Sequence, residues 1–365
     1  MTFMQIREGA IIPIPAVGSR PPQFHVFDSD SIDAIDAALA AQRPLLVRGE
    51  PGIGKSQLAR AAALQLRRAF VHEVVDARTE SRDLLWHYDA VTRLAEAQLQ
   101  GALKAPEAQP EQDVRTRLAV ARYVRPGPLW WAFDWTSARD QAEVVKTREP
   151  EPPDAGDAER RADPRRRCDP ANGCVVLIDE IDKAEPDVPN GLLEALGAGQ
   201  FLPLGAERPV VAAGPPPLVI ITTNEERALP DAFLRRCLVL HLRLPGLTEE
   251  PQEFKRVLIE RGRAHFGESL DALLERAADL LAEDRKTAEQ ARRLPLPGQA
   301  EYLDLVRAVL KLAGADAEAQ RAVIDRIADF ALKKHPDAIA ARRRRPRQAE
   351  AEALPPQDPD RPVGA

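Results

Sequence analysis

One stretch near the N-terminus has the residue types and spacing of a loop that wraps the phosphates of a nucleotide. It matches the pattern G-x-x-x-x-G-K-[ST], and we expect its residues and the next one to contact a nucleotide: Gly49, Glu50, Pro51, Gly52, Ile53, Gly54, Lys55, Ser56 and Gln57. Glycines let successive backbone N–H groups point at an anion, and the N-terminus of a following helix adds partial positive charge. The ammonium of Lys55 would reach the β- and γ-phosphates, and the hydroxyl of Ser56 would bind Mg²⁺.

Two adjacent carboxylates end an apolar run further along the chain. The run Cys174–Ile178 is followed directly by Asp179 and Glu180. A parallel strand that ends in carboxylates delivers them to the carboxyl edge of its sheet, where ligands of such sheets bind. We therefore expect Asp179 to hold Mg²⁺ through a water molecule. Glu180 would orient and deprotonate an attacking water.

A third polar group follows the apolar run Leu218–Ile221. Thr222 and Thr223 come next, and then Asn224. The amide of Asn224 could hydrogen-bond the γ-phosphate or the attacking water, and the alternative is an ordinary turn at a strand end.

Two arginines, Arg235 and Arg236, precede the apolar run Leu238–Leu240. A guanidinium can neutralise the charge that develops on a transferred phosphoryl group. An arginine that acts within its own chain needs no neighbour, whereas one that acts on the next chain makes activity depend on assembly. The sequence leaves both arrangements open.

The elements that must position these groups follow the order of an α/β fold. The run 44–47 predicts the strand before the phosphate loop, and 57–66 predicts the helix after it. Strands buried on both faces of a parallel sheet read as largely apolar runs, and we find five: 44–47, 70–75, 174–178, 218–221 and 238–240. Helical segments separate them. We predict a P-loop αβα sandwich around a mostly parallel five-stranded sheet.

Changes in composition divide the rest of the chain. Prolines interrupt residues 1–24, which predicts an irregular arm before a nucleotide-binding domain over 25–246. Within that domain, residues 136–172 are rich in Pro, Asp, Glu and Arg and predict a charged, flexible insertion. Segments with a helical period predict a small all-helical domain over 247–335, and the Arg- and Pro-rich tail 336–365 predicts disorder.

The composition of the chain argues against several classes of function. The chain has 365 residues, an apolar fraction of 44% and a net charge of −6, which argues against a general coat for nucleic acid. Three cysteines make no disulfide framework, and Cys174 and Cys237 begin apolar runs, so we expect core thiols in a reducing compartment. The longest apolar runs are far too short to span a bilayer, and we expect a soluble, cytoplasmic protein without membrane contact.

The order of these motifs over residues 25–335 resembles that of the AAA+ ATPases. Closer similarity is to the MoxR-like and dynein-related subgroup, through Gly127–Leu129, Leu177–Ala184 and Asn190–Leu196. The resemblance implies that the helical domain is a lid. It also implies a β-hairpin near Gly199–Leu204 that points towards a ring pore, and an insertion near Asp83–Leu85.

The resemblance also implies roles and partners. Lys55 and Ser56 would be the Walker A residues, Asp179 and Glu180 the Walker B residues, and Asn224 sensor 1. Arg236 would be the arginine finger that reaches the neighbour's nucleotide, with Arg235 as the second choice. The family uses ATP and Mg²⁺ and typically works as a hexameric ring, and this subgroup is associated with von Willebrand factor A partner proteins.

One departure from the family pattern concerns the lid. Gln299 stands about where a sensor 2 arginine is usual, and Arg292 or Arg293 could substitute for it. The main functional hypothesis is a MoxR-like chaperone that remodels, assembles or activates partner proteins. The alternatives are a nucleic-acid motor or loader, which the acidic balance disfavours, and a slowly hydrolysing regulatory switch in a larger assembly, such as a defence system. A small-molecule kinase would lack an acceptor domain.

Overall fold

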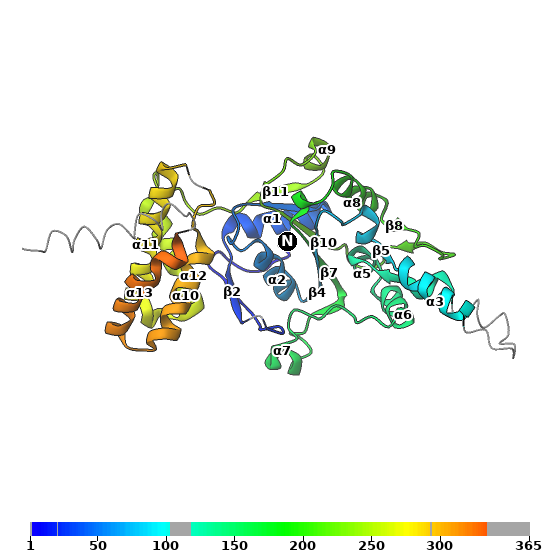
Figure 1. The fold of residues 1–365 in the computed structure, drawn as a ribbon, viewed down its shortest axis with the longest axis horizontal. Helices are drawn as coiled ribbons and strands as arrows, with labels where there is room; N and C mark the ends of the chain where they lie inside the picture. The colour runs from blue at the N-terminus through cyan, green and yellow to red at the C-terminus, as the bar shows by residue number, and fades with distance from the viewer. Residues whose placement is uncertain (1, 20, 103–117, 293, 334–365) are drawn as a thin grey trace, which may run out of the picture. The chain divides into compact units, whose positions relative to one another are not determined.

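The computed structural model describes residues 2–19, 21–102, 118–292 and 294–333 (Figure 1). The chain divides into two compact units between Arg243 and Leu244. The first unit carries the phosphate loop and the sheet, and the second is helical. The tail 336–365, predicted to be disordered, lies outside the described residues.

A five-stranded sheet organises the first unit. Its strands are β3 (Leu45–Arg48), β4 (Arg68–Val74), β7 (Asp169–Asp179), β10 (Leu218–Thr223) and β11 (Leu238–His241), in the spatial order β11-β3-β10-β7-β4. Every neighbouring pair is parallel. The predicted fold class, a mostly parallel five-stranded sheet with helices and a C-terminal helical region, is confirmed.

The register of the sheet brings the polar strand ends to one edge. Thr223 at the end of β10 is opposite Arg48 at the end of β3, and Ile221 is opposite Ile178 in β7. The loops that leave these strands therefore start side by side. This edge is where chain segments far apart in the sequence meet.

The strands form because their side chains are buried on both faces. All six residues of β10 are buried, and so is the apolar part of β7. Helix α1 (Ser29–Ala41) packs against β11, and α2 (Lys55–Leu66) packs against β7 and β4. Helix α5 (Pro128–Phe133) adds Trp130 and Trp131 to the core.

The N-terminal residues differ from the predicted irregular arm. Strand β1 (Ile11–Ile14) pairs antiparallel with β2 (Gln23–Val26). Ile12 and Ile14 are buried, whereas Ile11 is half exposed, which is the alternation of a strand with one covered face. Pro13 is tolerated because a strand in a two-stranded ribbon has one edge that needs no ladder hydrogen bonds.

The charged segment 136–172 also has more regular structure than the sequence led us to expect. It contains most of α6 (Trp135–Val145), the whole of α7 (Ala158–Ala162) and the start of β7. Ala138 and Ala142 bury one face of α6, and Asp134 caps its N-terminus by accepting a hydrogen bond from the Ser137 N–H at 3.0 Å. Small apolar residues, spaced by one turn among the charges, give this segment a face that packs.

The first unit contains further short elements. Strands β8 (Gln200–Phe201) and β9 (Val210–Val211) form the hairpin expected near residue 200. The others are η1 (Ser81–Leu84), β5 (Trp86–Tyr88), α3 (Ala90–Ala102), η2 (Val120–Tyr123), β6 (Val124–Pro126), η3 (Ile181–Lys183), α8 (Asp187–Ala198) and α9 (Asp231–Leu234).

The second unit consists of α10 (Pro251–Phe266), η4 (Glu268–Leu270), α11 (Asp271–Gln290), α12 (Gln299–Ala313) and α13 (Ala317–Leu332). Tyr302 is fully buried, and its hydroxyl donates to the Leu274 carbonyl at 3.3 Å. None of the helices in the described ranges is long and apolar enough to cross a membrane.

Candidate functional site

The phosphate loop connects β3 to α2 with a backbone that requires glycine. Gly49 has φ +152°, and a Cβ at this position would lie 2.2 Å from the backbone oxygen of Leu242. Gly54 has φ +106° and directly precedes Lys55, the first residue of α2. Left-handed residues next to a helix start turn backbone N–H groups inward, so the loop has the shape of an anion cradle.

Lys55 is buried and fully engaged. It is 7% exposed, and its Nζ donates to Gly49 O at 2.7 Å, to Glu50 O at 3.0 Å and to Asn224 Oδ1 at 2.7 Å. An ammonium has three N–H donors, and these three acceptors use all of them. The sequence predicted Lys55 and Asn224 at one site, and the sheet order brings them into direct contact.

Burial and nearby carboxylates act on Lys55 in opposite directions. Burial lowers the pKa of Lys55 below its ordinary value, and the negative charges of Asp179, Asp182 and Glu180 oppose that shift. An anionic ligand would stabilise the charged form of this buried ammonium, because the ligand adds further opposite charge beside it.

Asp179 ends β7 at the N-terminus of α2. Its Oδ2 accepts a hydrogen bond from Ser56 Oγ at 2.8 Å, its Oδ1 accepts one from Thr222 Oγ1, and His72 Nε2 lies 3.4 Å from Oδ2. Burial alone would raise the pKa of Asp179, but the hydrogen bonds from His72, Thr222 and Ser56 together lower it to about 2. Asp179 is therefore a carboxylate throughout the physiological range.

Glu180 follows Asp179 with an unusual backbone. Its φ of +62° is in the left-handed region, and its N–H donates to Thr222 Oγ1 at 3.0 Å. One oxygen of its side chain lies 2.7 Å from Lys183 Nζ, and the other lies 3.5 Å from Asn224 Nδ2. The strained turn directs Glu180 towards Asn224 rather than along the strand.

Four polar residues of this site were missed from the sequence. Asp182 is 2% exposed and accepts hydrogen bonds from the N–H groups of Asn224 (3.4 Å) and Glu226 (3.0 Å), so it holds the loop after β10. The others are His72, Lys183 and Thr222. A polar side chain inside an otherwise apolar strand, such as Thr222 in β10, was the available signal.

The residues predicted for the site fall into two groups. The phosphate loop, the first turn of α2 with Gln57, Asp179, Glu180 and Asn224 all lie at the carboxyl edge of the sheet. Arg236 does not join them. It is exposed, as is Arg235, in the turn between α9 and β11, and both line a separate cavity of about 820 Å³.

A nucleotide with Mg²⁺ fits the donors and acceptors of the first group. The cradle offers backbone N–H groups and a cation for phosphates, and Ser56 Oγ lies beside an ionised carboxylate. Magnesium is usually held by one or two side chains together with phosphate and water oxygens. Among the described residues, no group of three or more His, Cys, Asp or Glu side chains is arranged as a metal cage.

The position expected for sensor 2 carries a glutamine. Gln299 is the first residue of α12, is 6% exposed, and accepts a hydrogen bond from Arg261 through Oε1. Arg292, one of the two suggested substitutes, is exposed next to the end of α11. Arg293 lies outside the described residues.

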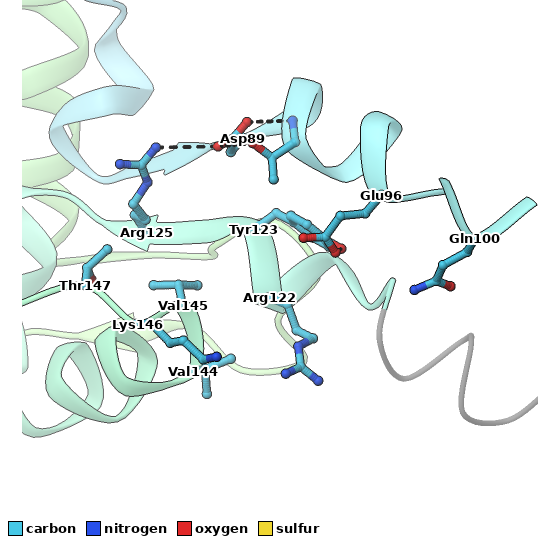
Figure 2. A pocket seen from close by; sticks show the side chains of 11 residues that line it. Asp89, Glu96, Gln100, Arg122, Tyr123, Arg125, Val144, Val145, Lys146 and Thr147 are labelled. Atoms are coloured by element: carbon cyan, nitrogen blue, oxygen red, sulfur yellow. Dashed lines mark hydrogen bonds and ion pairs between the residues drawn. The ribbon is translucent and has the colours of Figure 1, made fainter. Parts of the chain in front are cut away.

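A further cavity of about 390 Å³ lies on the side of the first unit formed by α3, β6 and α6 (Figure 2). Asp89 pairs with Arg125 at 3.7 Å there, and Tyr123 donates to Glu96 at 2.5 Å. Burial, with a contribution from Glu96, raises the pKa of Tyr123 to about 12. The cavity contains none of the predicted site residues, so it is distinct from the candidate nucleotide site.

Comparison with known proteins gives one family match. The family described as AAA domain (dynein-related subfamily) matches residues 44–237, a range that contains every predicted site residue from Gly49 to Arg236. No curated protein matches the chain. Among solved structures, similarity is found to a RuvB point mutant from Thermotoga maritima, with 14% identity, a TM-score of 0.40, and coverage of 82% of this chain and 68% of that one. A protein of Cytophaga hutchinsonii, described provisionally as an ATPase, has 15% identity, a TM-score of 0.32, and coverage of 90% and 89%.

Proposed function

We propose that this chain, which belongs to the dynein-related subfamily of AAA domains and is an ATPase, works as a MoxR-like remodelling enzyme. It would hydrolyse ATP with Mg²⁺ and use the energy to assemble or activate a partner protein. The observation that carries the nucleotide chemistry is the direct contact of Lys55 with Asn224, beside the contact of Ser56 with Asp179.

In this proposal the chain binds the triphosphate through its loop. The backbone N–H groups of residues 49–56 and the Lys55 ammonium hold the phosphate oxygens. Lys55 gives up at least one of its three present acceptors to do so. Ser56 and, through water, Asp179 hold the magnesium ion. When bound, Mg²⁺ neutralises charge on the β- and γ-phosphates.

Glu180 and Asn224 act on the water molecule. The water oxygen bonds to the γ-phosphorus, the bond from that phosphorus to the β–γ bridging oxygen breaks, and ADP and phosphate result. Glu180 accepts the proton that the water loses, and Asn224 orients the water or a γ-phosphate oxygen. The 3.5 Å approach of Asn224 Nδ2 to a Glu180 oxygen supports this pairing of roles.

Arg236 has its role in a neighbouring copy. We propose that it reaches the γ-phosphate bound by the next chain of a homo-oligomeric ring, with six subunits as in most of the family. Exposure of Arg235 and Arg236, away from the chain's own phosphate loop, supports an arginine that acts in trans. The expected partner is a client protein or a von Willebrand factor A protein, in the cytoplasm.

One observation favours a second candidate, a slowly hydrolysing regulatory switch. The residue at the expected sensor 2 position, Gln299, is neutral, buried and bonded to Arg261 of its own helical unit, so its own side chain offers no charge to a phosphate. A turnover far below that of remodelling enzymes, unchanged by any partner, would favour the switch. Stimulation by DNA would favour the nucleic-acid motor instead, which the net charge of −6 disfavours.

The experiment that tests the main proposal uses a variant that binds ATP and stays in the ATP-bound state. Glu180→Gln should bind ATP without hydrolysing it, so a tagged Glu180→Gln chain in ATP should form a ring by mass photometry and retain its client in a pull-down. The Lys55→Ala chain in ATP and the Glu180→Gln chain in ADP are the controls. A Glu180→Gln chain that binds ATP but neither assembles nor retains a protein would overturn the remodelling role.

A further inference from the structure

The turn that carries Arg235 and Arg236 is held by a single side chain from a distant segment. Arg43 lies between α1 and β3, about 190 residues earlier in the chain. Its Nε donates to the Arg236 carbonyl at 3.0 Å, and its Nη2 donates to the carbonyls of Arg235 and of Cys237, the latter at 3.3 Å. One guanidinium thus binds three consecutive backbone oxygens.

These carbonyls need a partner for a general reason. They belong to the C-cap residue of α9 and to the two residues after it, so no further helical turn supplies N–H donors to them, and α9 is only four residues long. Its C-terminal turn therefore has little regular structure to fix its direction. The guanidinium of Arg43 supplies three donors in a rigid plane, together with a positive charge at the negative end of the turn.

The Arg43 contact joins two places that the ATPase cycle would use. Arg43 precedes β3 by two residues, and β3 runs directly into the phosphate loop of the same chain. The backbone contact from Leu238 N–H to Pro44 O at 2.9 Å continues the connection into the pairing of β11 with β3. The segment that leads to the chain's own nucleotide thus also fixes the base of Arg236.

The side chains on this turn are left facing outward. Arg235 and Arg236 are exposed, whereas Arg43 is half-buried, and all three line the same cavity with Glu194 of α8. Because three of the five N–H donors of Arg43 bind the backbone of the turn, this third arginine acts on the position of the turn.

We propose that Arg43 is a positioning residue that holds the backbone of residues 235–237 so that Arg236 is presented to the neighbouring chain's nucleotide. The inference rests on the proposed trans role of Arg236 and adds a residue that nothing in the motif pattern assigns. The hydrogen bonds described for Arg43 go to the carbonyls of residues 235–237, and none goes to the phosphate loop. Its loss should lower turnover while leaving nucleotide binding intact.

The test compares Arg43→Met, which keeps the length of the side chain and removes its donors, with Arg236→Ala. We expect each variant to lower kcat by about tenfold or more, with the affinity for ADP within about twofold of the unaltered chain. Arg43→Lys, which keeps the charge but not the planar fork, should recover only part of the rate. Arg93→Met is the matched control, because Arg93 also binds a backbone carbonyl, that of Leu118 at 3.0 Å, far from the turn.

Mixing experiments separate positioning from general damage. A Lys55→Ala chain has an intact Arg236 but no nucleotide site, so mixing it with Arg43→Met chains should restore turnover, as it should for Arg236→Ala chains. A mixture of Arg43→Met with Arg236→Ala should keep the low turnover of the separate variants, because neither chain presents a working Arg236. Restored turnover in that second mixture would place Arg43 in its own chain's site and overturn the inference.

Other outcomes distinguish the inference from the proposed function. If Arg236→Ala loses turnover while Arg43→Met keeps it, the inference fails and the role of Arg236 stands. If Arg236→Ala keeps full turnover, the role of Arg236 fails and the inference falls with it. Thermal unfolding checks that Arg43→Met folds. If it does not fold, Arg43→Lys replaces it in the same mixtures. A full rate for Arg43→Lys would then count against the inference.

Discussion

The ammonium nitrogen of Lys55 lies 2.7 Å from the amide oxygen of Asn224, across 169 positions of sequence. The contact joins the first residue of α2 to the residue that follows β10. With two loop carbonyls it completes the hydrogen bonding of Lys55, so the cation is held in place before any phosphate arrives. The side chains of the proposed site are therefore already in position, and phosphate oxygens would replace one or more of the three acceptors of Lys55.

Asn224→Ala should separate binding from chemistry. The change removes one acceptor of Lys55 and the amide that would orient the water. We expect kcat to fall by about tenfold or more, while the affinity for ADP stays equal or rises, since Lys55 gains a free donor. Steady-state turnover and titration with a fluorescent ADP analogue measure the two quantities. A parallel loss of affinity and rate would instead give Asn224 a role in binding.

Lys55→Ala should abolish binding itself. The variant loses the only loop cation positioned for the β- and γ-phosphates among the described residues, and hydrogen bonds to charged groups are strong. We expect the affinity for ATP and for ADP to fall by about 100-fold. Calorimetric titration in the presence of Mg²⁺ checks this. An unchanged affinity would mean that the phosphates lie elsewhere, and the proposed site would be abandoned.

Gly49→Ala should damage the loop through the backbone. At φ +152° the new Cβ would lie 2.2 Å from the Leu242 oxygen, so the loop must shift away from the segment that follows β11. We expect a lower melting temperature and weaker ADP binding. Gly314→Ala is a suitable comparison, because that glycine also has a positive φ but open space around it. It should lose some stability and keep its ADP affinity.

Lys183→Met should release Glu180. The Lys183 ammonium lies 2.7 Å from a Glu180 oxygen, and the bond to Glu180 raises the pKa of Lys183. Without this ion pair the Glu180 oxygen is free to accept a hydrogen bond from a water molecule, so we expect basal turnover to rise by about two- to fivefold. The side chains of Lys183 and Glu180 are 41% and 33% exposed, so this ion pair contributes little to stability and the melting temperature should hardly change. A fall in turnover would show that Lys183 holds Glu180 in its working position.

Glu73→Gln should change stability with pH in a defined direction. Burial raises the pKa of Glu73, and the smaller effect of His72 opposes this. The pKa of Glu73 is therefore higher in the folded chain than in the unfolded chain. Ionised Glu73 lowers the stability of the folded chain at any pH above the folded pKa. This loss of stability vanishes below the unfolded pKa. Glu73→Gln should therefore unfold at higher urea near pH 8, with a gain that disappears towards about pH 4.

Asp76→Asn supplies the control of opposite sign. A hydrogen bond from the Arg78 N–H lowers the pKa of Asp76, so its carboxylate favours the folded chain at neutral pH, and the variant should lose stability there. A gain for Glu73→Gln that is equal at both pH values would contradict the pKa argument.

The sequence alone determined the chemistry and the type of fold. The loop from Gly49 to Ser56 and the strand ends at Asp179 and Asn224 are local patterns, because glycine spacing and apolar runs of strand length carry their meaning within a few residues. The same local signals predicted the five parallel strands. Prolines and charges also predicted irregular chain in two segments where the structure has β1 and α6. These two elements form because each packs one face against the rest of the first unit.

Only the tertiary structure decided which of these groups touch. The contacts of Lys55 with Asn224, of Thr222 with Asp179 and of Arg43 with the turn at Arg236 join residues more than 40 positions apart, and two of them join residues more than 160 apart. Such contacts depend on the order β11-β3-β10-β7-β4 and on its register, which places the ends of non-consecutive strands side by side. No local periodicity encodes that order, since strand order is settled by how the buried faces of the whole unit pack together.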